Sequence, residues 1–231
     1  MTIWETLWGE SRFILEGTFV LLQLLICILT VGFIVGTLLS ITQNYGPKVL
    51  AVPTAFFKRF FLSIPPIILL LVFYFGFGAQ SGFNISPFVA AIAALGLRSA
   101  AYQSQIFTGA LMAVKAGQLE AAYSLGLSRW GVIQYVLLPQ AYRLAVGPWT
   151  SEFSSSMKGT ALAYLIGVVE LVRTGKYIIS YSYGNALIVY FLIAMIFLVL
   201  TRTGNALLYR LERKVRIPGF EGREVRLGQV H

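Results

Sequence analysis

The stretch Thr18–Ile41, which reads TFVLLQLLICILTVGFIVGTLLSI, contains no charged side chain. A helix needs about 20 mostly apolar residues to cross the hydrocarbon core of a bilayer, so this stretch is long enough to span it. Two further charge-free stretches, Phe60–Leu97 and Tyr177–Thr201, follow along the chain. The pattern predicts a chain that folds within a membrane.

The composition agrees with this prediction. Of the 231 residues, 57% are hydrophobic and only 12% are charged. Soluble domains carry about 25% charged residues, so this chain has too little polar surface to cover a water-soluble globule. These values argue against a soluble enzyme, a secreted disulfide scaffold and a disordered regulator. The single cysteine, Cys27, and the single histidine, His231, provide neither a disulfide framework nor a metal site, so we expect no catalytic residues and no bound metal.

Loop signals divide the chain into about five spans of an all-α integral membrane protein. The long stretch Phe60–Leu97 is broken by a cluster of Gly and Ser at 76–82 and by Pro87, residues that mark loops. We expect Pro65-Pro66 to kink or interrupt the second span. The five spans are expected at about 18–41, 52–75, 88–113, 140–169 and 186–209.

The orientation follows from the basic residues. The net charge is +9, and the Lys and Arg residues lie mostly between and after the apolar stretches. Cytoplasmic loops are rich in Lys and Arg, which places the C-terminal tail in the cytoplasm and the N-terminus outside. Arg173 and Lys176, after the fourth span, oppose this orientation. Because no soluble domain presents a basic face, we expect no nucleic-acid partner.

The segment 117–138, between the third and fourth spans, is long for a membrane loop. Gln118–Leu125 favours a helix, Gly126 permits a left-handed turn that ends it, and Ser128 is suited to cap a second helix through Leu138. The pattern fits an interfacial helix that rests on lipid. It fits equally a helix that docks a cytoplasmic partner.

The order of residues in this segment is similar to the EAA signature of permease subunits of ATP-binding-cassette (ABC) importers. Glu120-Ala121-Ala122 is followed by Gly126 and then by Leu138-Pro139. The wider chain resembles the polar amino acid uptake branch of that family. Matching segments are Ala101-Tyr102, Lys158 with Thr160-Ala161-Leu162, and the tail Leu211–Gly219.

The resemblance implies a membrane permease subunit that transports a polar amino acid across the inner membrane, with acidic or broad-range substrates left open. It implies a second permease subunit, in a homodimer or a heterodimer, and an extracellular or periplasmic amino-acid-binding protein. It also implies ATPase subunits that contact Glu120, Ala121, Ala122, Gly126, Leu138 and Pro139. The chain has no Gly-x-x-x-x-Gly-Lys-Ser/Thr phosphate loop. We therefore expect no cofactor in this chain and expect ATP and Mg²⁺ on the partner ATPase.

Two departures from the branch concern the substrate. Ser104–Gly109 lacks the acidic and the basic residue that are common there, and Gly159 stands where an acidic residue is common. The resemblance implies that segment 117–138 couples ATP hydrolysis by the partner to transport, and these differences leave this coupling segment intact. They put the usual substrate contacts in doubt and mildly disfavour a purely cationic substrate.

Polar residues inside the predicted spans are the candidate substrate pathway. A charged side chain at the bilayer centre costs at least about 2.5 kcal/mol, so it is expected to face a wet cavity or a partner. Arg98 is expected either to hold a substrate carboxylate, to reach the interface, or to pair with Glu152. Glu152 is expected to take an amino group or to pair with Arg98 or Lys158. The candidates are Arg98, Tyr102, Gln105, Glu152, Ser156 and Lys158.

An alternative is an ion-gradient-driven secondary transporter or channel subunit. That class is typified by internal repeats and paired acidic ligands. The sequence does not divide into two repeats of equal length, and it contains no second EAA-like segment. A purely structural anchor would not need the charged residues of the fourth span.

Overall fold

The computed structural model describes residues 9–78, 84–182 and 186–215. These residues form helices joined by short connections, and no strand occurs among them. The expected positions of the N-terminus and of the end of the tail lie outside the described residues. Residues 79–83 also lie outside them, and they belong to the loop between the second and third predicted spans, which lacks Lys and Arg and is therefore expected outside the cell.

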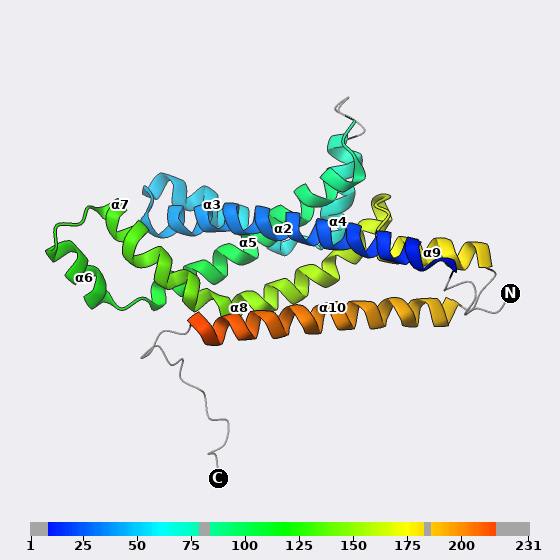
Figure 1. Cartoon of the computed structure of the whole chain (residues 1–231). Coiled ribbons are helices and arrows are strands. Elements are labelled where there is room, and N and C mark those ends of the chain that lie inside the picture. The colour runs from blue at the N-terminus through cyan, green and yellow to red at the C-terminus, as the bar shows by residue number, and fades with distance from the viewer. Residues whose placement is uncertain (1–8, 79–83, 183–185, 216–231) are drawn as a thin grey trace, which may run out of the picture.

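The helices follow one another in a simple order. They are α2 (Ser11–Tyr45), α3 (Lys48–Ser63), α4 (Pro66–Leu71), η1 (Val72–Gly78), α5 (Pro87–Ala113), α6 (Ala116–Ser124), α7 (Arg129–Val132), η2 (Ile133–Leu137), α8 (Leu138–Gly159), η3 (Thr160–Ile166), α9 (Leu171–Ser182) and α10 (Ala186–Val215). Figure 1 shows α2, α8 and α10 along the long direction of the molecule, with α6 and α7 at one end and α9 at the other.

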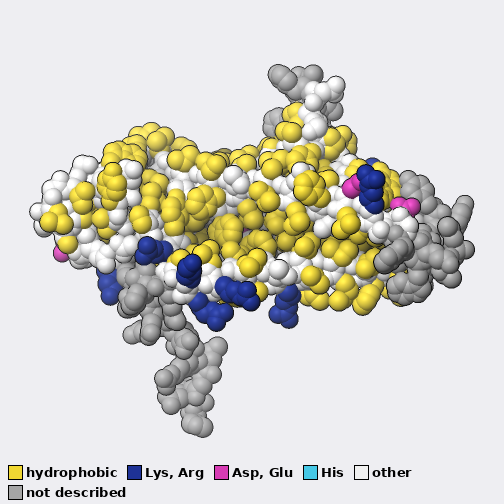
Figure 2. All heavy atoms as spheres, viewed as in Figure 1, with side chains coloured by type: hydrophobic (Ala, Val, Ile, Leu, Met, Phe, Trp, Pro, Cys, Tyr) yellow, Lys and Arg dark blue, Asp and Glu magenta, His cyan; other side chains and the backbone are white. Residues whose placement is uncertain are grey.

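Two described helices, α2 and α10, are each long and apolar enough to cross a membrane. At about 1.5 Å per residue, their 35 and 30 residues exceed the roughly 30 Å of a bilayer core. Figure 2 shows hydrophobic side chains over most of the visible face, whereas Lys and Arg gather around the C-terminal part of α10. This distribution is that of a membrane protein with one basic end.

The second predicted span is not a single helix. We expected one span at 52–75, but α3 and the helix Pro66–Gly76 meet at an angle of 104°. Ile64 and Pro65 between them are extended, with ψ of 131° and 137°. Proline lacks an N–H and disfavours the helical conformation of the residue before it, so the Pro65-Pro66 pair ends α3 and starts α4. The interruption expected at these prolines is confirmed.

The fourth predicted span also has different boundaries. The helix expected to end near Leu138 instead continues from α7 through η2 into α8, and η2 is a widened π turn. Pro139 lies two residues after that turn, and a proline ring crowds the carbonyl one turn earlier, which a π turn relieves. At the other end, the helix gives way to η3 and stops at Gly167, whose φ of 108° is left-handed. Residues 167–169 are therefore not part of the helix.

Small residues bring α2 and α5 close together. A Cβ atom on Gly32 would lie 2.3 Å from the Gln103 amide nitrogen, and one on Gly36 would lie 3.0 Å from the Ala100 carbonyl oxygen. Close approach through small residues is typical of membrane helix pairs. The contact fixes α5 and, through it, the position of the polar residues that α5 carries.

Candidate functional site

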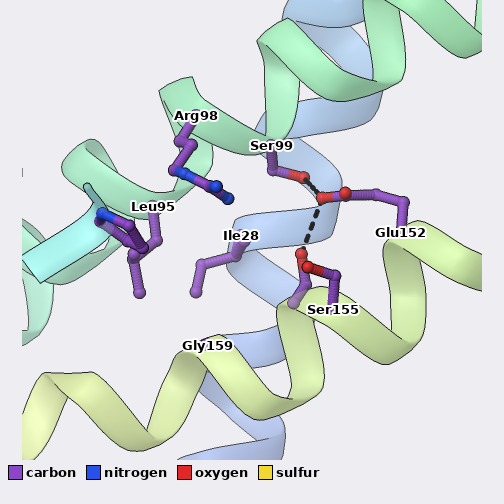
Figure 3. A pocket seen from close by; sticks show the side chains of 9 residues that line it. Ile28, Leu95, Arg98, Ser99, Glu152, Ser155 and Gly159 are labelled. Carbon is purple, nitrogen blue, oxygen red and sulfur yellow. Dashed lines mark hydrogen bonds between the residues drawn. The ribbon is translucent and has the colours of Figure 1, made fainter. Parts of the chain in front are cut away.

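Helices α2, α5 and α8, with the start of α4, enclose a cavity of about 130 Å³. Its apolar walls include Ile28 and Leu95, and Pro66 lines it from the bend. Figure 3 shows Arg98 and Ser99 on one side and Glu152 and Ser155 on the other. The polar residues that line it are Arg98, Ser99, Glu152, Ser155 and Ser156.

The carboxylate of Glu152 is held from two helices. Ser99 on α5 and Ser156 on α8 donate hydrogen bonds to its Oε1, at 2.7 and 2.8 Å. The side chain is only 5% exposed. Hydrogen bonds from two directions fix where the negative charge lies in the cavity.

A second layer of hydrogen bonds fixes Ser99 in turn. The buried Gln103 donates from Nε2 to Ser99 Oγ at 3.1 Å and to the Leu29 carbonyl at 3.2 Å. Its own Oε1 accepts from the Trp149 indole N–H at 2.8 Å. Trp149, Gln103, Ser99 and Glu152 therefore form one continuous network, and such buried networks are rigid when every member is satisfied.

Arg98 does not share this network. Its guanidinium lies 4.9 Å from the centre of the Tyr102 ring, a cation–π contact. Its Nε is buried and has no hydrogen-bond partner among the residues that the structure describes. Within the described part of the chain, the one ion pair is Arg12–Glu16, so Arg98 is not paired with Glu152. A buried donor that the described residues leave unsatisfied is costly.

The structure brings together part of the predicted pathway. Arg98, Glu152 and Ser156 line one cavity, and Tyr102 lies against Arg98. Lys158 is exposed on α8 and does not line this cavity. Gln105 lines a different cavity, next to Lys58.

Sequence reasoning did not select the residues that support the site. Ser99 contacts Glu152 directly, while Gln103 and Trp149 act one and two steps away. The spacing of four between Ser99 and Gln103 places them on one helix face. That spacing is the signal available in the sequence, but it does not reveal which face of α8 they meet.

The predicted turn of the segment 117–138 is confirmed. Gly126 has a φ of 80°, and the Leu127 N–H closes the end of α6 on the Ala122 carbonyl at 3.2 Å. Ser128 caps α7 by accepting from the Gly131 N–H at 3.2 Å. Glycine adopts the left-handed conformation without strain, which explains its place at this helix end.

The two faces of this segment differ. Ala122 is 4% exposed and packs in a cluster with Val132 and Leu137, so its small size serves the packing of the chain itself. Several large apolar side chains are exposed instead, and patches of this kind mark interaction sites. Glu120, Ala121, Gly126 and Pro139 are exposed, and Leu138 is half-buried. The exposed large apolar residues are Tyr123 (50%), Leu125 (83%), Trp130 (70%) and Tyr135 (68%).

A buried carboxylate lies beyond the fourth predicted span, at the start of α9. Glu170 is fully buried and accepts from the backbone N–H groups of Val172 and Arg173, at 3.0 and 3.1 Å. Burial raises the pKa of Glu170 to about 7, although these two hydrogen bonds oppose the shift. The group caps α9 as an acidic residue at a helix N-terminus does.

The chain is similar to known transport proteins over almost its full length. Residues 28–217 match the family described as binding-protein-dependent transport system inner membrane component. The glutamine transport system permease protein GlnP of Escherichia coli is 31% identical over 215 residues, which are 93% of this chain and 98% of that protein. The arginine transport system permease protein ArtQ of Bacillus subtilis is 32% identical over 210 residues, 90% of this chain and 94% of that protein. A crystal structure of an amino acid ABC transporter with histidines has a TM-score of 0.81 and 30% sequence identity, and the match covers 89% of this chain and 95% of that one.

Proposed function

Since the chain belongs to the family of inner membrane components of binding-protein-dependent transport systems, we propose that it forms the pathway by which an ABC importer moves a polar amino acid into the cell. Its relatives are amino acid permeases, transport subunits rather than enzymes. Because the chain belongs to this family, we prefer the ABC importer to the alternative of an ion-gradient-driven transporter or channel subunit.

The cavity between α5 and α8 is proposed to bind the amino acid as a zwitterion. The supporting observation is that Arg98 and Glu152 line the same cavity without pairing, and that the Arg98 Nε has no partner. A guanidinium matches a carboxylate in a planar, two-pronged contact. In the proposed complex the substrate carboxylate lies at Arg98 and its ammonium group at Glu152.

The charges that line the cavity indicate what charge the substrate side chain carries. Arg98 and Glu152 contribute one charge of each sign, and a zwitterion uses both. Gly159 also lines the cavity, and a Cβ atom there would meet nothing within 4 Å. The sequence left acidic and broad-range substrates open. The balanced charge favours a polar side chain without net charge.

Uptake into proteoliposomes that hold the complete transporter tests this proposal. Arg98→Gln removes a charge-assisted contact worth about 1.5–3 kcal/mol, so uptake at limiting substrate is expected to fall by about ten- to a hundredfold. The matched control is Lys158→Gln, because Lys158 is exposed and lies outside the cavity lining. Normal uptake by Arg98→Gln would contradict the proposed contact.

The coupling role is proposed for the exposed part of segment 117–138. Glu120, Ala121 and Gly126 are accessible there, next to large exposed apolar side chains. We propose that ATPase subunits, which bind ATP and Mg²⁺, dock on this surface from the cytoplasm. Ala122 supports the surface from beneath rather than contacting the ATPase.

The remaining partners follow from the family. A second permease subunit is proposed to complete the pathway, and an extracellular or periplasmic binding protein is proposed to deliver the amino acid to the end that carries α9. The basic residues around the C-terminal part of α10 support a cytoplasmic position for that end.

A further inference from the structure

A second polar cavity, of about 410 Å³, lies between α2, α3 and α5. Two cations, Lys58 and Arg59, line it from α3. Gln43, Ser63 and Gln105 add amide and hydroxyl groups, and no acidic residue belongs to the lining. The donors outnumber the acceptors, so the cavity suits an anion such as a carboxylate or a phosphate.

The cations of this cavity have no anionic partner in the described chain. Lys58 is only 9% exposed, and its ammonium group donates to the side-chain oxygen of Gln43. Neither Lys58 nor Arg59 forms an ion pair with any described residue. A buried charge that is offset only by an amide dipole is costly, and a bound anion would offset it better.

The two cavities lie on the same face of α5. Arg98, Tyr102 and Gln105 are spaced by four and three residues, which places them in one row along the helix. Arg98 lines the first cavity and Gln105 the second, and seven residues of helix span about 10 Å. Because α5 runs from the first cavity towards α6, the second cavity lies nearer the segment 117–138 (Figure 1).

The bend of the second predicted span separates the cavities. Ser63, the last residue of α3, lines the second cavity, and Pro66, the first of α4, lines the first. The helices on the two sides of this bend meet at 104°.

We propose that this second cavity is an exit station that receives the carboxylate of the amino acid after it leaves Arg98. The inference rests on the proposed function, since it takes the same substrate as its ligand. A translocated anion must be bound well enough to enter and weakly enough to leave, which several successive sites achieve better than one. Lys58 and Arg59 hold the carboxylate at the second station, and Gln105 orients it.

Equilibrium binding to the complete transporter tests the station. The transporter is placed in phosphatidylcholine nanodiscs without binding protein, and radiolabelled L-glutamine, L-glutamate and L-arginine are titrated in turn. At least one is expected to bind in two components. Arg59→Gln should remove one component, Arg98→Gln the other, and Lys48→Gln neither. Lys48 is the control because it is an exposed cation on α3 that does not line the cavity.

The results of this titration distinguish a failure of the exit station from a failure of the proposed function. If no component depends on Arg59 for any of the three amino acids, the station is refuted, whatever Arg98→Gln does. If a component depends on Arg59 and none on Arg98, the station stands and the Arg98 contact fails. Arg59→Lys keeps the charge and should keep the component, so loss of the component in that variant too would refute a charge-based site.

Two further binding measurements identify which anionic group the second cavity binds, a carboxylate of the substrate or a lipid headgroup. Inorganic phosphate should compete with the component that depends on Arg59, because the site recognises an anionic group. Nanodiscs that contain phosphatidylglycerol should leave both components in place. Loss of the second component in those nanodiscs would assign the cavity to a lipid headgroup and overturn the exit station.

Discussion

Ser99 on α5 donates a 2.7 Å hydrogen bond to the carboxylate of Glu152 on α8, across 53 residues of sequence. This bond ties the two walls of the cavity together at its polar side. It also orients the carboxylate that we propose for the substrate ammonium group.

Replacing Ser99 should therefore disturb substrate handling. A hydrogen bond to a charged group contributes about 1.5–3 kcal/mol, so Ser99→Ala is expected to lower uptake at limiting substrate by about tenfold or more. Ser154→Ala is the control, because Ser154 makes a 2.8 Å hydrogen bond to Asn205 on α10 and not to Glu152. Equal effects of the two variants on uptake would show that Ser99 serves only helix packing.

Gly159 offers a direct test of selectivity. It has helical backbone angles, with φ of −63° and ψ of −31°, and open space where a side chain would go, so Gly159→Asp should fold. A second carboxylate in the cavity should shift uptake towards cationic amino acids and away from neutral ones. Gly159→Asn has almost the same shape without the charge and should not produce the shift. An unchanged ratio of arginine to glutamine uptake in Gly159→Asp would place the substrate elsewhere.

Two substitutions in segment 117–138 test its role in coupling, one at the exposed turn and one at the buried face. Gly126→Val forces a branched residue into a left-handed conformation that costs about 1–2 kcal/mol, and Ala122→Leu overpacks a buried position at about 1–3 kcal/mol. Both variants should lower uptake more than they lower ATP hydrolysis. Gly109→Val is the control, since Gly109 lies on α5 outside segment 117–138 and a Cβ atom there also meets nothing within 4 Å. Full coupling in both variants would indicate that the segment merely rests on lipid.

Membrane orientation can be read from cysteine labelling in a Cys27→Ala background. Asn84 and Ser124 are both exposed; Asn84 precedes α5, and Ser124 ends α6, which follows α5. A cysteine at Asn84 should react with an impermeant reagent added outside the cell, and one at Ser124 only after the membrane is opened. The reverse pattern would remove the coupling segment from the cytoplasm and with it the proposed ATPase contact.

The capping carboxylate of α9 predicts a pH dependence. The pKa of Glu170 rises from 4.5 to about 7 on folding, so the folded protein holds this proton more tightly than the unfolded chain. The resulting stabilisation is complete below pH 4.5 and is lost as the pH rises through 7. The melting temperature in detergent should therefore fall between pH 5.5 and pH 8.

Glu170→Gln should flatten that fall, because the neutral amide keeps an acceptor and cannot titrate. Glu16→Gln serves as the control, since Glu16 is exposed and pairs only with the exposed Arg12. The assignment to Glu170 would be wrong if Glu170→Gln retained the full pH dependence.

Local features of this protein were predictable from the sequence. Charge-free stretches such as Thr18–Ile41 indicate membrane helices, since the bilayer selects for length and hydropathy within a single segment. The left-handed Gly126, the Ser128 cap and the interruption at Pro65-Pro66 are likewise set by one or two residues. The ordered EAA-like residues, read together, were sufficient for the family.

The composition of the cavity was decided by the tertiary structure. Arg98, Glu152 and Lys158 look alike in the sequence, as charges inside apolar helices, yet two line the cavity and one is exposed. Gln105 lines a second cavity with Lys58, on a helix that the sequence did not connect with it. Which helix faces meet depends on how closely α5 packs on α2 at Gly32 and on where α8 then lies. That packing joins residues more than fifty positions apart, and no local pattern of hydropathy or spacing records it.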